Sequence, residues 1–109
     1  MHCIEEWSGS LRIRKWVDGK EGDCIPGHGH KHNHTTFVMS GICRIEATLL
    51  DGSKFDETFI APTHAPILAG VRHKLTAMVD GTEWWCVFSH RDFNGQVIED
   101  SIGNEEAYV

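Results

Sequence analysis

The chain has 109 residues, 40% of them hydrophobic, and a formal net charge of −6 at pH 7. This length and apolar content suffice for one domain with a buried core. The acidic balance argues against a nucleic-acid partner, because proteins that bind nucleic acid usually present a basic face. No apolar run approaches the ~18–20 residues of a membrane span, and the N-terminus lacks a signal-peptide pattern. We therefore expect a cytoplasmic protein without a membrane partner.

The four cysteines lie far apart and form no Cys-x2-Cys pair: Cys3, Cys24, Cys43 and Cys86. An even number of cysteines is compatible with two disulfides in a secreted chain. We favour reduced thiols in a reducing compartment, where cysteine behaves as a small buried hydrophobic residue.

Taken in order, the chain first gives an ambiguous segment at residues 1–7. Residues 11–17 then alternate cleanly, with Leu11, Ile13 and Val17 on one face and Arg12 and Arg14 on the other. This period of two predicts a half-buried strand whose arginines face solvent.

Further strands are predicted at residues 42–50, 53–60, 73–79 and 83–89, separated by turn signals such as Asp51-Gly52 and Asp80-Gly81. Residues 61–66 hold two prolines and predict a loop. Residues 96–98 are a candidate edge strand, and residues 104–109 are predicted to form a loose tail. No window has a helical period, so the pattern predicts an all-β sandwich or barrel.

Four of the eight histidines fall at alternate positions of one stretch, GDCIPGHGHKHNHTTFVMSG, at residues 22–41. A His-x-His pair on a strand puts both imidazoles on one face, and imidazole commonly binds transition metals. Four rings on a straight strand would spread over roughly 20 Å, too far to share one ion. We therefore expect a turn after His30, at residues 31–33, so that His34 returns to the metal. His32 would lie exposed in this turn and is the substitute ligand if His34 points away.

The spacing resembles the first motif of small metal-binding cupins, G-x5-H-x-H-x3-4-E-x6-G. Every interval is matched, with His34 in place of the usual Glu, by Gly22, His28, His30, His34 and Gly41. The second motif is matched in its Gly70-x2-His73 core. Its leading Gly is missing, its Pro-to-Gly interval is two residues longer, and Ala77 replaces the Asn.

The resemblance implies an all-β double-stranded β-helix, the jelly roll or cupin barrel. It also implies a single cupin domain over residues 1–109, with a barrel core at about 10–90 and a C-terminal tail at about 91–109. The implied metal ligands are His28, His30, His34 and His73.

Four neutral imidazoles leave a divalent ion with its full charge of +2, whereas three histidines and a carboxylate leave +1. The more positive site is a stronger Lewis acid and favours anionic ligands. Fe(II) is favoured, with Ni, Zn, Cu, Co and Mn as alternatives. The usual Glu is lost as a proton acceptor, which leaves Glu57, on the face of Phe55 and Phe59, as a candidate base.

Strand parity places side chains around this site. We expect Thr36 and Val38 to share the face of His34, and Leu75 and Ala77 that of His73. Further expectations are that Phe37 and Met39 face away, that one of Trp84 and Trp85 points inward, and that Cys86 fills the core or lies near the metal. The outward tryptophan, with Trp16, would form an exposed aromatic patch of the kind that marks oligomer contacts, which favours a homodimer.

Three functions fit these features. The first, slightly favoured by the resemblance to cupins with all-histidine sites, is a metal-dependent dioxygenase acting on a small anionic substrate. The second is a metal-dependent isomerase or lyase, which requires a base. The third is a non-catalytic protein that binds a metal or a small ligand. Whether the protein is an enzyme stays open at this point, because one fold supports many functions.

Overall fold

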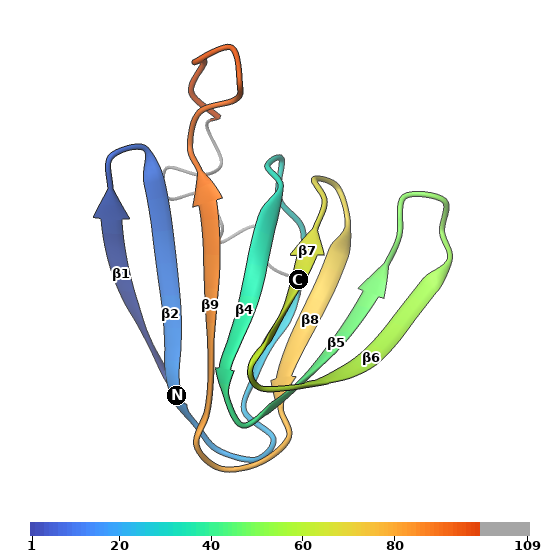
Figure 1. Cartoon of the computed structure of the whole chain (residues 1–109). Coiled ribbons are helices and arrows are strands. Elements are labelled where there is room, and N and C mark those ends of the chain that lie inside the picture. The colour runs from blue at the N-terminus through green and yellow to red at the C-terminus, as the bar shows by residue number, and fades with distance from the viewer. Residues whose placement is uncertain (99–109) are drawn as a thin grey trace.

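The computed structural model describes residues 1–98, which form strands and connecting loops in two antiparallel sheets (Figure 1). The strands are β1 (His2–Ser8), β2 (Leu11–Gly19), β3 (Cys24–His28), β4 (His34–Ser40), β5 (Ile42–Thr48), β6 (Lys54–Ile60), β7 (Thr63–Ile67), β8 (Arg72–Ala77) and β9 (Thr82–Ser89). This arrangement is the jelly roll that the resemblance to cupins implies, and it fits the all-β sandwich or barrel that the strand pattern predicts.

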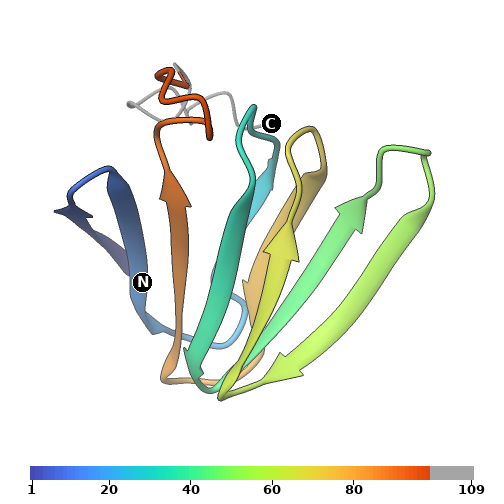
Figure 2. The same ribbon diagram turned by 45° about the horizontal axis from the view of Figure 1, so that its top comes forward.

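One sheet has five strands in the order β1-β2-β9-β4-β7, and the other has four in the order β3-β8-β5-β6. Strands distant in sequence therefore pair, as β2 does with β9 and β3 with β8. In Figure 2 the strands converge at the end that carries the β4–β5 and β6–β7 connections and spread towards the opposite end. The β3–β4 loop and the β7–β8 turn lie together at the spread end, joined by a 2.8 Å hydrogen bond from Gly70 N to His30 O.

The core lies between the sheets and follows the alternation along each strand. Its largest member is Trp84 of β9, which is fully buried. It packs with side chains from both sheets: Ile25, Val38, Cys43, Ile45, Ala65, Leu75 and Ala77. The parity predictions for β4, β8 and β9 are confirmed, because Thr36, Val38, Leu75, Ala77 and Trp84 face inward, while Phe37 and Met39 are exposed.

The turn between β4 and β5 passes close to the start of β9. Gly41 has a φ of +73°, and a Cβ there would lie 2.4 Å from Thr82 Oγ1. The buried Thr82 hydroxyl donates a 2.7 Å hydrogen bond to Val79 O and holds this corner together. Only glycine combines this backbone conformation with this close approach.

Two segments differ from the predictions. Residues 63–67 form β7, although Pro62 and Pro66 led to the prediction of a loop at residues 61–66. β7 is an edge strand of its sheet, where a proline such as Pro66 costs no internal ladder hydrogen bond. The ambiguous N-terminal segment is β1, which pairs with β2 along its whole length.

The faces of β2 are the reverse of the prediction. Leu11 is 42% exposed, whereas Arg12 is only 5% exposed. The burial of Arg12 is compensated by a 2.6 Å hydrogen bond to Glu5 and by the rings of Trp7 and Phe88, which lie 5.5 and 5.7 Å from its Cζ. A paired guanidinium that stacks on aromatic rings tolerates burial, which hydrophobic alternation alone does not anticipate.

Other expectations concern the cysteines and the C-terminal end. None of the four cysteines is in a disulfide bond. Near the C-terminal end, Val97 forms an isolated bridge with Arg91. The predicted tail at residues 104–109 lies outside the described residues. No helix within residues 1–98 is long and apolar enough to cross a membrane.

Candidate metal centre

Three histidines converge inside the spread end of the barrel. His28 ends β3 and lies directly opposite His73 of β8 in the strand pairing. His30 follows in the β3–β4 loop. One nitrogen from each of these three side chains lies within 4.8 Å of the others. The prediction that the chain turns between residues 30 and 34 is confirmed, since β3 ends at His28 and β4 begins at His34.

Backbone carbonyl groups orient two of these rings. His28 Nδ1 donates to Pro26 O at 2.8 Å, and His73 Nδ1 donates to Val71 O at 3.0 Å. These bonds place the ring protons on Nδ1 and leave Nε2 with a lone pair, the arrangement that orients metal-ligating histidines. The buried Nε2 of His73 and Nδ1 of His30 have no hydrogen-bond partner in the described part of the chain. Buried nitrogens without partners fit a bound cation.

The other two histidines of the stretch adjoin this triad. His34 begins β4, is buried, and has its ring centroid 5.1 Å from that of His73, but it lies outside the compact group of three. Its Nε2 also lacks a partner among the described residues. His32 was predicted to be exposed, and this prediction is wrong. It is 2% exposed and stacks on Phe88, with ring centroids 4.0 Å apart.

Burial keeps the cluster neutral. Desolvation is the main cause that lowers the pKa of His73 to about 4 and that of His30 to about 2, and the neighbouring histidines lower both further. The pKa values of His28 and His34 are lowered in the same way, with a contribution from the positive charge of Arg14. Neutral imidazole is the form that binds metal, so the cluster is ready to coordinate an ion near neutral pH.

The cluster borders an inner cavity of about 20 Å³. Its lining comprises Arg14, Trp16, Ile25, His28, His30, His34, Leu75, Cys86 and Phe88. Arg14 and Trp16 were predicted to face solvent, and both predictions are wrong because the faces of β2 are reversed. Cys86 packs against the core and also lines the cavity, so both of the positions considered for it fit the structure. A cavity this small holds about one water molecule.

Strand register offered a signal for these missed residues. Arg14 pairs with Cys86, and Trp16 pairs with Trp84. Residues directly opposite each other in a sheet share a face, so the inward placement of Trp84 also places Trp16 inward. The pairing of β2 with β9, however, cannot be read from the sequence alone.

The candidate base does not belong to this cavity. Glu57 shares the face of Phe55 and Phe59, as predicted, but it is exposed and does not line the cavity. Among the described residues, no acidic side chain lines it. The histidine donors near the cavity are neutral imidazoles, which suit Fe, Cu, Co, Ni and Zn.

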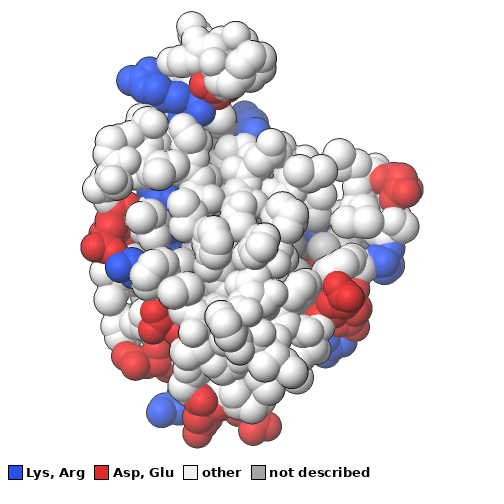
Figure 3. All heavy atoms as spheres, viewed as in Figure 1, with Lys and Arg blue, Asp and Glu red and all other residues white. Residues whose placement is uncertain are grey.

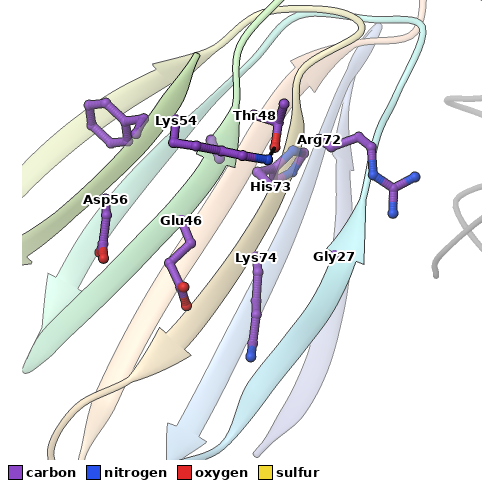
Figure 4. A pocket seen from close by; sticks show the side chains of 10 residues that line it. Gly27, Glu46, Thr48, Lys54, Asp56, Arg72, His73 and Lys74 are labelled. Atoms are coloured by element: carbon purple, nitrogen blue, oxygen red, sulfur yellow. Dashed lines mark hydrogen bonds between the residues drawn. The ribbon is translucent and has the colours of Figure 1, made fainter. Parts of the chain in front are cut away.

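A larger groove of about 420 Å³ lies along β5, β6 and β8 (Figure 4). Its side chains carry mixed charge and pair locally. Lys54 Nζ donates to Thr48 Oγ1 at 2.9 Å, and Asp56 accepts from Arg44. Two of its charged side chains, Lys54 and Asp56, are therefore already engaged by neighbouring residues.

The jelly-roll fold and the cluster of buried histidines are the features that the resemblance to small metal-binding cupins implies. Comparison with protein-family models and with curated proteins found no match. Solved structures do match.

Oxalate decarboxylase from Lactobacillus farciminis, in a formate complex, has a TM-score of 0.64 at 22% identity, with 92% of this chain and 35% of that chain covered. Bacillus subtilis oxalate decarboxylase, studied for its Mn(II) centres, has a TM-score of 0.63 at 17% identity, with 80% and 27% covered. Protein NMB1881 from Neisseria meningitidis has a TM-score of 0.62 at 14% identity, with 79% and 80% covered. The chain thus spans about a third of the decarboxylase chains, and these likenesses establish the fold.

Proposed function

We propose that the protein binds one divalent transition metal and uses it as a dioxygenase on a small anionic substrate. His28, His30 and His73 are the proposed ligands, with His34 as the fourth. The observation that carries the proposal is the convergence of three buried imidazoles within 4.8 Å of one another, two of them held by carbonyl groups so that Nε2 is available.

Fe(II) is the metal we favour, with Mn, Ni, Zn, Cu and Co as alternatives. Mn(II) centres are named for the structurally similar Bacillus subtilis enzyme. When bound, such an ion supplies a Lewis acid and, in the case of iron, a redox centre that reacts with O2.

The residues of the chain prepare the site for this chemistry. Carbonyl groups of Pro26 and Val71 fix the ligand rings, so little ordering is needed when the ion binds. Trp16 and Phe88 cover the inner cavity with apolar surface and limit the entry of water. Low polarity strengthens the attraction between the ion and an anionic ligand.

Two alternatives rest on specific observations. The small inner cavity favours a non-catalytic binder, because a substrate larger than a few atoms enters only if side chains move. The likeness to oxalate decarboxylases keeps a lyase open. The isomerase or lyase is weakened by the absence of acidic side chains from the cavity lining of the described residues.

The test is to reconstitute metal-free protein separately with Fe(II), Mn(II) and Zn(II) and to follow dissolved O2 with a panel of small carboxylates. Uptake that requires both Fe(II) and one substrate, and that is lost in His73→Ala, supports the dioxygenase. Carbon dioxide release without O2 consumption would indicate a lyase. Metal binding without turnover of any substrate would favour the binder.

The expected homodimer is also a proposal. Ile4 and Phe37 lie in one cross-strand row on the outer side of the five-stranded sheet and are 45% and 37% exposed. Figure 3 shows a face with uncharged side chains across its middle and charged ones at its margins. Sedimentation velocity decides the question: a single species of about 12.3 kDa would overturn the dimer.

A further inference from the structure

A sulfur atom borders the inner cavity besides the imidazoles. Cys86 of β9 is the only cysteine among residues 1–98 that lines this cavity. Three imidazoles line it as well, those of His28, His30 and His34. His73, the third member of the compact triad, is not among the described residues that line it. The cavity is therefore surrounded by a set of donors that differs from the triad.

Strand register brings Cys86 and His34 to the same part of the five-stranded sheet. Cys86 pairs with Thr36, and His34 lies two residues before Thr36 on β4. Residues two positions apart on a strand point to the same face, so Cys86 and His34 are diagonal neighbours on the inner face. Thr36 Oγ1 lies 3.7 Å from Cys86 Sγ. A hydroxyl at this position can donate a hydrogen bond to a thiolate and so stabilise its charge.

A nitrogen atom without a partner points independently to a ligand in the cavity. His34 is only 5% exposed, and its Nε2 has no hydrogen-bond partner within the described part of the chain. A buried polar atom in this state calls for a ligand that the protein itself does not supply. The cavity of about 20 Å³ has room for about one water molecule, and a divalent transition-metal ion is no larger.

We propose that the inner cavity is a second position for the metal ion, at which Cys86 and His34 bind the ion together with His28 or His30. This inference rests on the proposed metal site and names the class of ion that it selects. Cys86 and His34 lie outside the compact group of three, so both side chains close on the ion as it binds.

The sulfur ligand decides which ions prefer the cavity. A divalent ion deprotonates a coordinating thiol, so the S–H proton passes to solvent as the sulfur–metal bond forms and the ligand is a thiolate. Thiolates favour ions such as Zn(II) and Co(II), whereas Mn(II) prefers oxygen ligands. We therefore expect Cys86 to raise the affinity for Zn(II) and Co(II) and to leave the affinity for Mn(II) unchanged.

The experiment uses the full chain, freed of metal under reducing conditions and then loaded with Co(II). A thiolate bound to Co(II) gives a strong charge-transfer absorption in the near ultraviolet, which imidazole ligands do not give. Wild-type protein is compared with Cys86→Ser and Cys86→Ala. Cys24→Ser is the matched control, because Cys24 is exposed on β3 and does not line the cavity.

We expect the charge-transfer band in wild-type protein and in Cys24→Ser. Both Cys86 variants should still bind Co(II) through the imidazoles, but without this band. Competition with a chelator gives the affinities for Zn(II) and Mn(II). Cys86→Ser should bind Zn(II) at least about tenfold more weakly, since even the loss of a group that only orients a ligand costs this much. Its affinity for Mn(II) should equal that of the wild type.

A Co(II)-loaded wild type without the band would overturn the inference, and so would a band that persists in the Cys86 variants or disappears in Cys24→Ser. Equal losses of Zn(II) and Mn(II) affinity in Cys86→Ser would also contradict it, because they indicate damage to the site as a whole. A wild type that binds no Co(II) would overturn the proposed function instead. If Cys86→Ser does not fold because its hydroxyl is buried, Cys86→Ala provides the same comparison without a polar group.

Discussion

The imidazole of His32 lies flat on the ring of Phe88, with centroids 4.0 Å apart and an angle of 11° between the planes. Phe88 lines the inner cavity beside the histidine triad, whereas His32 lines an outer pocket of about 420 Å³. The stacked pair is therefore a wall between the candidate metal centre and a pocket large enough for a small organic molecule.

Removing the ring of His32 should make the candidate metal centre more accessible and leave the proposed ligands in place. We expect His32→Ala to lose about 1–3 kcal/mol of unfolding free energy, because a buried ring contact disappears, and to keep its metal content. Transfer of the bound metal to a coloured chelator should become faster than in the wild type. His64→Ala, which removes an exposed histidine on β7, is the control. An unchanged transfer rate in His32→Ala would show that the stacked pair does not limit access.

His34 occupies the position at which the cupin motif usually has Glu, so His34→Glu tests its place in the site. The variant should still bind one ion and should weaken the binding of azide, because the site falls from a charge of +2 to +1. Absorption of the Co(II) form measures both. A variant that binds the ion with an unaltered spectrum and unaltered azide affinity would place His34 away from the metal.

The buried histidines should make the metal-free protein sensitive to mild acid. Folding lowers the pKa of His73 to about 4 and that of His30 to about 2, whereas both have a pKa near 6.5 when unfolded. The unfolded chain therefore binds more protons below pH 6.5. Stability should be complete above this pH and fall by about 1.4 kcal/mol per pH unit for each such histidine as the pH drops.

Urea unfolding at pH 7.5, 6.0 and 5.0 measures this slope. His73→Gln should lose less stability over the same range, because it removes one of the responsible groups. The exposed aspartates whose pKa is lowered, such as Asp56, titrate at more acid pH and contribute little here. A stability that does not change between pH 7.5 and 5.0 would contradict the burial of neutral histidines.

Gly41 should be required by the fold. Gly41→Ala forces a Cβ to within 2.4 Å of Thr82 Oγ1 and 2.7 Å of Thr82 Cα, in addition to the strain of a positive φ. Gly52→Ala is the matched control, because Gly52 has a φ of +87° with nothing within 4 Å of the added Cβ. We expect Gly41→Ala to lose at least about 1 kcal/mol more than Gly52→Ala in thermal unfolding. Equal losses of stability in the two variants would contradict this prediction, because they would show that the backbone around Thr82 shifts at little cost.

The sequence predicts most of the fold where local patterns carry the information. Asp51-Gly52 and Asp80-Gly81 mark real turns, and the alternation around Val38 and Leu75 identifies inward faces correctly. Prediction from the alternation fails at β2, where Arg12 is buried by partners from β1 and β9 that no local pattern reveals. The pattern also fails at β7, whose Pro66 is tolerated because the strand lies at a sheet edge.

In the candidate site, too, local sequence patterns predict some of the residues, and tertiary packing decides the position of the others. The spacing of the histidines predicts that His28 and His30 share a face and that the chain turns before His34, and the resemblance to cupins adds His73 to the set. Arg14 and the stacked His32 escape prediction. Their positions depend on which strands become neighbours across the barrel, and that is decided by tertiary packing.

The central claim is that the histidine cluster holds a divalent metal ion, and metal content tests it most directly. Protein expressed without a His tag in unsupplemented medium should contain about one transition-metal ion per chain by elemental analysis. His28→Ala and His30→Ala should lose most of it while the barrel stays folded by circular dichroism, and His64→Ala should retain it. Unchanged metal content in the first two variants, or little metal in the wild type, would contradict the account.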